Sequence, residues 1–145
     1  MGHIPLLLSV ALQVMGITTT WGPPECVTQT TLMGEYNPSA QVITLCPENI
    51  SNNSTTVEIT VKHEMWHGVW DHMGWEESLI PDPVFNWMCR QFIDSGEVLS
   101  VISLYPSEHV NEELEARMVA QFVPTPAVAL IGVLSEVYSL SQGVK

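Results

Sequence analysis

The spacing of apolar and polar residues along the chain predicts a mostly helical protein with a small sheet. Residues 4–17 form an apolar run of helical length, and residues 40–46 alternate between apolar and polar side chains in the manner of a strand. Residues 27–36 are expected to form another strand that ends at Gly34. Residues 18–26 are rich in Gly and Pro and are expected to form a loop.

Helical signals dominate the remainder of the chain. Thr55 and Glu58 have the spacing of a capping box, so a helix is expected to start at residue 56 and to stop at Gly74. Asp82 and Ser107 are expected to cap two later helices. The later helices are expected from Pro83 toward Gly96, over residues 108–122, and from Thr125 toward Gly143, whereas residues 97–104 fit a helix or a strand.

Without an internal repeat or a linker, these elements indicate one α+β domain over residues 1–145. It is expected to be mostly helical with a small β-sheet. A chain of 145 residues with 46% hydrophobic content can bury a substantial core. The formal net charge is −12, from 16 acidic and 4 basic residues. A nucleic-acid backbone would be repelled, so nucleic acid is excluded as a partner.

The apolar run at residues 4–17 has two interpretations. It lacks a preceding Lys or Arg and a small-residue cleavage site, so a buried N-terminal helix is favoured over a signal peptide or membrane anchor. It is also too short and too interrupted to span a bilayer. We therefore expect no membrane association, and a cytoplasmic or virion-associated location is favoured over secretion.

The three cysteines, Cys26, Cys46 and Cys89, give an odd number without CxxC spacing. Such a set argues against a cysteine-built metal site or a disulfide framework. Buried free thiols are expected, and a bridge between Cys26 and Cys46 remains the alternative.

The strongest chemical signal is the H-E-x-x-H motif formed by His63, Glu64 and His67. A helix turns by about 100° per residue, so the two histidines point in nearly the same direction, one turn apart. They can occupy two corners of a tetrahedral Zn²⁺ site, while Glu64 can take a proton from an attacking water. His72 lies nearly opposite His67 on the helix and is not expected to be a ligand. The alternative is a histidine-rich helix without a metal.

A third metal ligand is expected from the helix over residues 108–122. Glu113 lies beside Ala116 and Ala120 at the edge of the apolar face, where small side chains permit close packing against another helix. Glu115 is the second candidate. Glu112 points away from the apolar face of this helix, and its replacement by alanine is expected to have no effect.

Three further residues complete the candidate site or explain it differently. Tyr105 and His109 precede Glu113 closely, and either could donate a hydrogen bond to the oxygen of an attacked carbonyl. In the other interpretation, Glu113 only pairs with Arg117, four residues later, on a solvated helix face.

The sequence "HEMWH", followed by "EELEAR" with its Glu113 46 residues after His67, resembles the gluzincin-type zinc peptidases. It is also similar to the short peptidase-like domains of the ImmA/IrrE group and to small phage-encoded or cyanobacterial HExxH proteins. The resemblance implies a minimal zincin-like fold and a Zn²⁺ ion held by His63, His67 and Glu113. It further implies hydrolysis of a peptide or protein substrate with Glu64 as general base. The alternative is a non-catalytic structural or binding protein on the same scaffold, with a protein partner.

Overall fold

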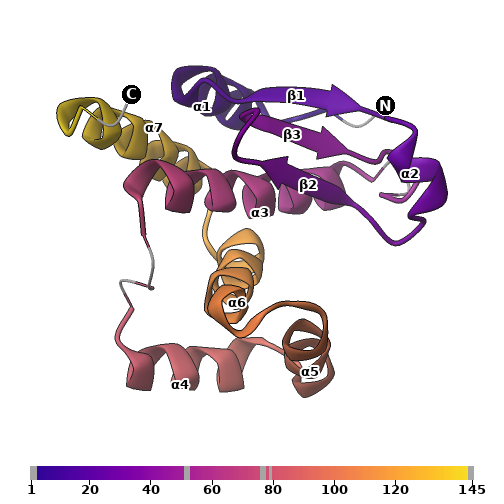
Figure 1. Ribbon diagram of the computed structural model, residues 1–145, viewed down its shortest axis with the longest axis vertical. Helices are drawn as coiled ribbons and strands as arrows, with labels where there is room; N and C mark the ends of the chain where they lie inside the picture. The colour runs from indigo at the N-terminus through magenta and orange to yellow at the C-terminus, as the bar shows by residue number, and fades with distance from the viewer. Residues whose placement is uncertain (1–2, 51–52, 76–77, 79, 144–145) are drawn as a thin grey trace.

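The computed structural model describes residues 3–50, 53–75, 78 and 80–143. Within this part the chain is mostly helical and contains a small sheet (Figure 1). The helices are α1 (Leu6–Met15), α2 (Glu25–Thr28), α3 (Ser54–Met73), α4 (Asp82–Phe92), α5 (Ser95–Leu104), α6 (Ser107–Phe122) and α7 (Thr125–Ser141). The strands are β1 (Thr18–Trp21), β2 (Gly34–Asn37) and β3 (Val42–Leu45). The predicted α+β, mostly helical fold class is confirmed.

The sheet has the order β1-β3-β2, with β3 in the centre. β1 runs parallel to β3, with Thr18 opposite Val42, and β2 runs antiparallel to β3, with Gly34 opposite Leu45. β2 is therefore an edge strand, and it packs alongside α3. In Figure 1 the sheet with α1, α3 and α7 forms the upper part of the molecule, and α4, α5 and α6 lie below it.

The structure confirms one predicted strand and corrects the rest of the sheet. The strand expected over residues 40–46 is β3, but the strand expected to end at Gly34 begins there instead, and its first two residues, 27 and 28, belong to α2. A Cβ atom at Gly34 would lie 2.7 Å from Thr60 Cγ2, so glycine allows β2 to approach α3 closely. Residues 18–21, expected to be loop, form β1, because their β-branched and aromatic side chains suit a strand once β3 offers a partner.

The long helix α3 ends as predicted but begins differently. Gly74 terminates it in the left-handed conformation, with φ of 64°. The N-cap is Asn53 rather than Thr55, since the Asn53 side chain accepts a hydrogen bond from the Thr55 backbone N–H. The helix therefore starts at Ser54.

The later helices are present with shifted ends. Asp82 and Ser107 are the first helical residues of α4 and α6 rather than their caps, because a proline holds the N-cap position before each of them. α4 ends at Phe92, before the predicted stop. Asp94 then caps α5 by accepting a hydrogen bond from the Gly96 backbone N–H, which makes residues 97–104 helical.

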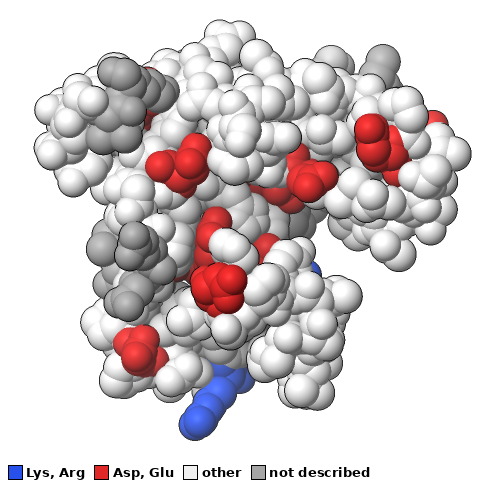
Figure 2. All heavy atoms as spheres, viewed as in Figure 1, with Lys and Arg blue, Asp and Glu red and all other residues white. Residues whose placement is uncertain are grey.

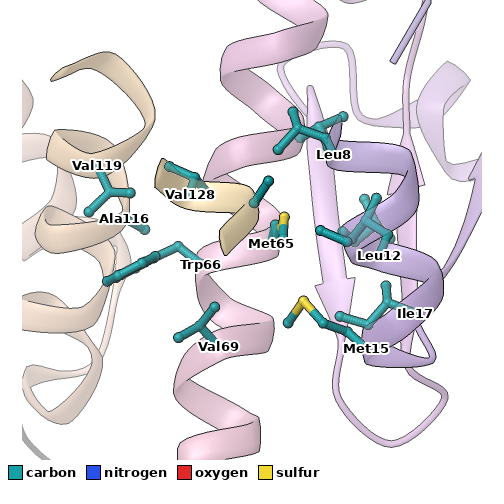
Figure 3. Packing of buried hydrophobic residues seen from close by; sticks show 14 of the residues in the cluster. Leu8, Leu12, Met15, Ile17, Met65, Trp66, Val69, Ala116, Val119 and Val128 are labelled. Carbon is teal, nitrogen blue, oxygen red and sulfur yellow. The ribbon is translucent and has the colours of Figure 1, made fainter. Parts of the chain in front are cut away.

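The N-terminal helix is buried on one face, as predicted. In α1, Leu8, Leu12 and Met15 join the main hydrophobic cluster and pack against α3 and α7. Figure 3 shows these side chains meeting Met65 of α3. None of the described helices has the length and apolar character needed to cross a membrane.

A second hydrophobic cluster lies between α4, α5 and α6. It consists of Phe85, Ile93, Val101, Leu114 and Met118. α6 also contributes Ala116 and Val119 to the main cluster, where Figure 3 shows them facing Trp66 of α3. α6 therefore connects the two clusters and is held firmly against α3.

The prediction of free thiols at Cys26 and Cys46 is wrong, and the alternative, a bridge between them, is present. These two residues form a disulfide, with their Cα atoms 5.3 Å apart, and Cys89 is a free cysteine. The bridge joins α2 to the residue that follows β3. Its partners are 20 residues apart in sequence, and they meet only because α2 folds back over the end of the sheet.

Candidate metal centre

The two motif histidines converge on one point beside α3. His63 and His67 lie one turn apart on the helix, and their Nε2 atoms are 3.2 Å from each other. Their ring centroids are 4.9 Å apart. Both side chains are partly exposed, at 18% and 19%. The spacing in the sequence therefore produces the predicted pair of imidazoles at the surface of a cleft.

Glu113 of α6 completes the cluster. Its Oε1 atom lies 3.2 Å from His63 Nε2, and its Oε2 atom lies 3.2 Å from His67 Nε2. Two donors bound at about 2.0–2.1 Å to one tetrahedral zinc are separated by about 3.3 Å. The distances among the three side chains match that separation, and the chemistry of two imidazoles and one carboxylate suits zinc. The residues therefore fit a zinc ion.

The small residues beside Glu113 explain how α6 comes so close. Ala116 and Ala120 are buried, at 0% and 2% exposure, on the side of α6 that packs toward α3. Glu113 itself is only 3% exposed. Glu115 is equally buried but lies outside the cluster formed by His63, His67 and Glu113 in the described part of the chain.

Glu113 does pair with Arg117, as the alternative interpretation predicted, but the pair does not lie on a solvated helix face. Arg117 Nε donates a hydrogen bond to Glu113 Oε1 at 3.2 Å, but the carboxylate is buried rather than solvated. Arg117 also pairs with Glu97 of α5 at 2.9 Å. Burial opposes ionisation of Glu113, and the hydrogen bonds from His63 and His67 outweigh it, so the pKa of this carboxyl lies far below its usual range.

Glu64 lies next to the cluster and lines the same cleft. Its side chain is 7% exposed, and burial raises the pKa of its carboxyl, while the neighbouring His63 and His67 reduce that rise. The backbone N–H of Tyr36 in β2 donates a hydrogen bond to it. A carboxylate with a raised pKa, close to the metal ligands, can accept a proton and release it again.

Glu112 is a site residue that the sequence analysis missed. Its Oε1 atom lies 2.7 Å from His67 Nδ1, on the side of the ring opposite the cluster. Burial alone would lower the pKa of His67, but hydrogen bonds to Glu112 and Glu113 raise it to about 10. Glu112 does point away from the core, as expected, but it points toward the cleft. This contact makes Glu112 a candidate to influence His67, which the sequence analysis did not foresee.

The other candidate residues divide between the cleft and the far side of α3. Tyr105 and His109 both line the cleft. Burial and the negative charge of Glu113 raise the pKa of Tyr105, and the His109 side chain is 58% exposed. His72 faces away from the cluster, as predicted, and its Nδ1 atom lies 3.0 Å from Glu136 Oε2 of α7.

The cleft that holds these residues has a volume of about 810 Å³. Its walls come from β2 and the segment before it, from the exposed side of α3, and from the start of α6. The cluster of His63, His67 and Glu113 therefore lies in a space that is large enough for several residues of a peptide and is open to solvent.

Comparisons with family models, curated proteins and solved structures gave no match to this chain. Function must therefore be inferred from the side chains themselves and from the cleft in which they lie.

Proposed function

We propose that the protein is a zinc-dependent peptidase. The observation that carries this proposal is the convergence of His63, His67 and Glu113, with mutual distances of 3.2 Å, beside the buried carboxylate of Glu64 in an open cleft. A structural zinc site is closed by four protein ligands, whereas a catalytic site has three and leaves one position open. Three ligands facing a cleft favour the catalytic type.

In this proposal the three side chains hold the zinc, and the remaining residues manage protons and charge. A bound zinc ion supplies Lewis-acid chemistry, which lowers the pKa of water and polarises a carbonyl. Glu64 accepts the proton of the attacking water and later delivers it to the leaving amine. Glu112 fixes the ring of His67 so that Nε2 faces the cluster.

Tyr105 and His109 are proposed to assist at the substrate carbonyl. Both lie in the wall of the cleft and carry polar hydrogens that can be donated to a developing negative charge. The two are not equivalent. Besides burial, the negative charge of Glu113 acts on the Tyr105 hydroxyl and raises its pKa. His109 instead lies near Glu112, with His109 Nδ1 3.8 Å from Glu112 Oε2.

The sheet edge supports a peptide as the substrate. β2 pairs with β3 on one side only, and residues of β2 line the cleft next to α3. An extended peptide can add to such an edge through backbone hydrogen bonds. The net charge of −12 is unfavourable for nucleic acid, so a peptide or protein remains the proposed substrate.

The test is hydrolysis of a mixed peptide pool by protein loaded with one zinc per chain. Glu64→Gln removes the proton acceptor but keeps the proposed ligands, so it should retain zinc and lose turnover by about 10²-fold or more. Glu48→Gln, at an exposed acid outside the cleft, is the matched control and should cleave like the parent. Equal turnover by Glu64→Gln and the parent would rule out this mechanism.

The family and the location remain proposals. The resemblance to gluzincin-type and ImmA/IrrE-type proteins agrees with the ligand set proposed for this site. A cytoplasmic or virion-associated location is less easily reconciled with the Cys26–Cys46 disulfide, because such bonds persist mainly in oxidising compartments. Thiol counting on freshly isolated protein tests this: one reactive thiol is expected if the bridge forms in the cell, and three if it does not.

A further inference from the structure

The cleft continues along α3 beyond the metal ligands. Trp70, Asp71 and Gly74 line it after His67, and Asp71 is four residues further on. One helical turn advances about 5.4 Å along the axis, so the Asp71 side chain is one step from the cluster in the direction of the helix C-terminus. A substrate residue next to the reacting bond would reach this distance.

Asp71 is held in place by β2. Tyr36 donates a hydrogen bond from its hydroxyl to Asp71 Oδ2 at 3.0 Å. This bond uses one carboxylate oxygen and fixes the direction of the group. Asp71 is otherwise exposed within the cleft, so its charge is available to a ligand.

Aromatic side chains line the same cleft as this carboxylate. Trp70 and Trp75 meet edge to face, with ring centroids 5.7 Å apart, and both line the cleft with Tyr36. Aromatic rings attract cations over their faces and also pack against the alkyl stem of a long side chain. A carboxylate in a cleft with such rings in its wall suits a cation carried on an apolar stem.

Among Asp, Glu, Lys and Arg side chains, the described wall of the cleft carries only acids. The acidic residues of its wall are Glu35, Glu64, Asp71, Glu112 and Glu113, whereas no Lys or Arg lines it in the described part of the chain. Figure 2 shows several acidic side chains around the hollow of this face. Arg117, which pairs with Glu113 of this wall, is also engaged by Glu97.

We propose that Asp71, with Trp70, Trp75 and Tyr36, forms a specificity subsite for a Lys or Arg side chain next to the scissile bond. This inference rests on the proposed peptidase function and names the substrate class: peptides with a basic residue beside the cleaved bond. Asp71 pairs with the cation, and the aromatic rings cover its stem.

The test compares matched peptides that carry either lysine or norleucine at positions flanking the bond. The parent protein, loaded with zinc, should cleave the lysine peptide with a kcat/KM roughly fivefold or more above that of the norleucine peptide, the size of one partly exposed ion pair. Asp71→Asn removes the charge but can still accept the Tyr36 hydrogen bond, and it should bring this ratio close to one.

Two control variants separate charge from structure. Tyr36→Phe removes the hydrogen bond that orients Asp71 but keeps the carboxylate and the ring, so the lysine preference should fall below that of the parent and stay above that of Asp71→Asn. Asp82→Asn, at an exposed acid outside the cleft, should retain the full preference. A lysine preference that survives Asp71→Asn, or is absent from the parent, would overturn the subsite.

A binding measurement distinguishes failure of the subsite from failure of the peptidase proposal. The same peptides are titrated into zinc-loaded Glu64→Gln and into the double variant with Asp71→Asn. Charge-dependent binding that Asp71→Asn weakens, without hydrolysis by the parent, supports the subsite and contradicts the peptidase. Hydrolysis without a lysine preference contradicts the subsite alone. Equal binding of both peptides together with no hydrolysis contradicts both.

Discussion

Glu112 Oε1 lies 2.7 Å from His67 Nδ1, on the opposite side of the imidazole from Nε2, which faces Glu113 at 3.2 Å. A carboxylate in this position holds a ligand histidine in one tautomer and one orientation, and it makes the ring a better donor. Glu112, which precedes the proposed ligand Glu113 in sequence, therefore supports a different proposed ligand, His67.

Replacing Glu112 should weaken zinc binding without abolishing it. Loss of such a supporting carboxylate typically costs about 10- to 100-fold in metal affinity. Glu112→Gln should show this loss in a competition titration against a chromogenic chelator. Glu108→Gln, at an exposed acid in the first turn of the same helix, should bind zinc as the parent does. An unchanged affinity in Glu112→Gln would mean that the hydrogen bond has no influence on the metal.

The choice between Glu113 and Glu115 can be made directly. Glu113→Gln should lose stoichiometric zinc, because a two-histidine site remains. Glu115→Gln should keep it, because Glu115 is buried outside the cluster. Metal content after gel filtration is the measurement for both variants. If Glu115→Gln lost zinc and Glu113→Gln kept it, α6 would have to present Glu115 rather than Glu113 to His63 and His67.

The metal-free protein should lose the stabilising effect of His67 at high pH. The pKa of His67 is raised from 6.5 to about 10 in the folded state, so its contribution is fully present below about pH 6.5 and is lost as the pH rises through 10. The difference in free energy of unfolding between the parent and His67→Gln, from urea titrations after chelator treatment, should therefore decrease from pH 6.5 to pH 10. A difference that grows over this range contradicts the assigned shift.

The crossing of α7 over α1 and α3 depends on Gly132. A Cβ atom there would overlap the Met65 methyl group and lie 2.9 Å from Met15 Sδ. Gly132→Ala should lower the free energy of unfolding by up to about 2 kcal/mol, because displacing two fully buried methionine side chains costs about 1–3 kcal/mol and the better helix propensity of alanine offsets up to about 1 kcal/mol of it. Leu134→Ala, on the exposed side of the same helix, should change it by less than about 0.5 kcal/mol. Thermal or urea unfolding would show whether the two variants differ in this order.

Features set by local sequence were predictable. The four-residue spacing of His63 and His67 determines that they share a helix face, and Gly74 marks the helix end through its own backbone preference. Glu113 could be found because Ala116 and Ala120 reveal which side of α6 packs closely. Each of these inferences needs only the period of one helix.

Features that depend on the meeting of distant segments were not predictable in the same way. The direction of the Glu112 side chain was predicted relative to the apolar face of α6. Its contact depends instead on the position of His67 on α3. Cys26 and Cys46 meet only after α2 has folded over the end of β3. Residues 18–21 are a strand only because β3 pairs with them in parallel. The periodicity of apolar residues in a helix or a strand does not show which distant segments that element will contact.

Anomalous diffraction at the zinc edge, on crystals of protein purified without chelator and supplied with zinc, tests the proposed catalytic metal site most directly. We predict one peak per chain, about 2.0–2.2 Å from His63 Nε2, His67 Nε2 and a Glu113 oxygen, with the remaining position open to the cleft. A peak elsewhere, no peak between these side chains, or a fourth protein ligand that closes the site would contradict the proposed function.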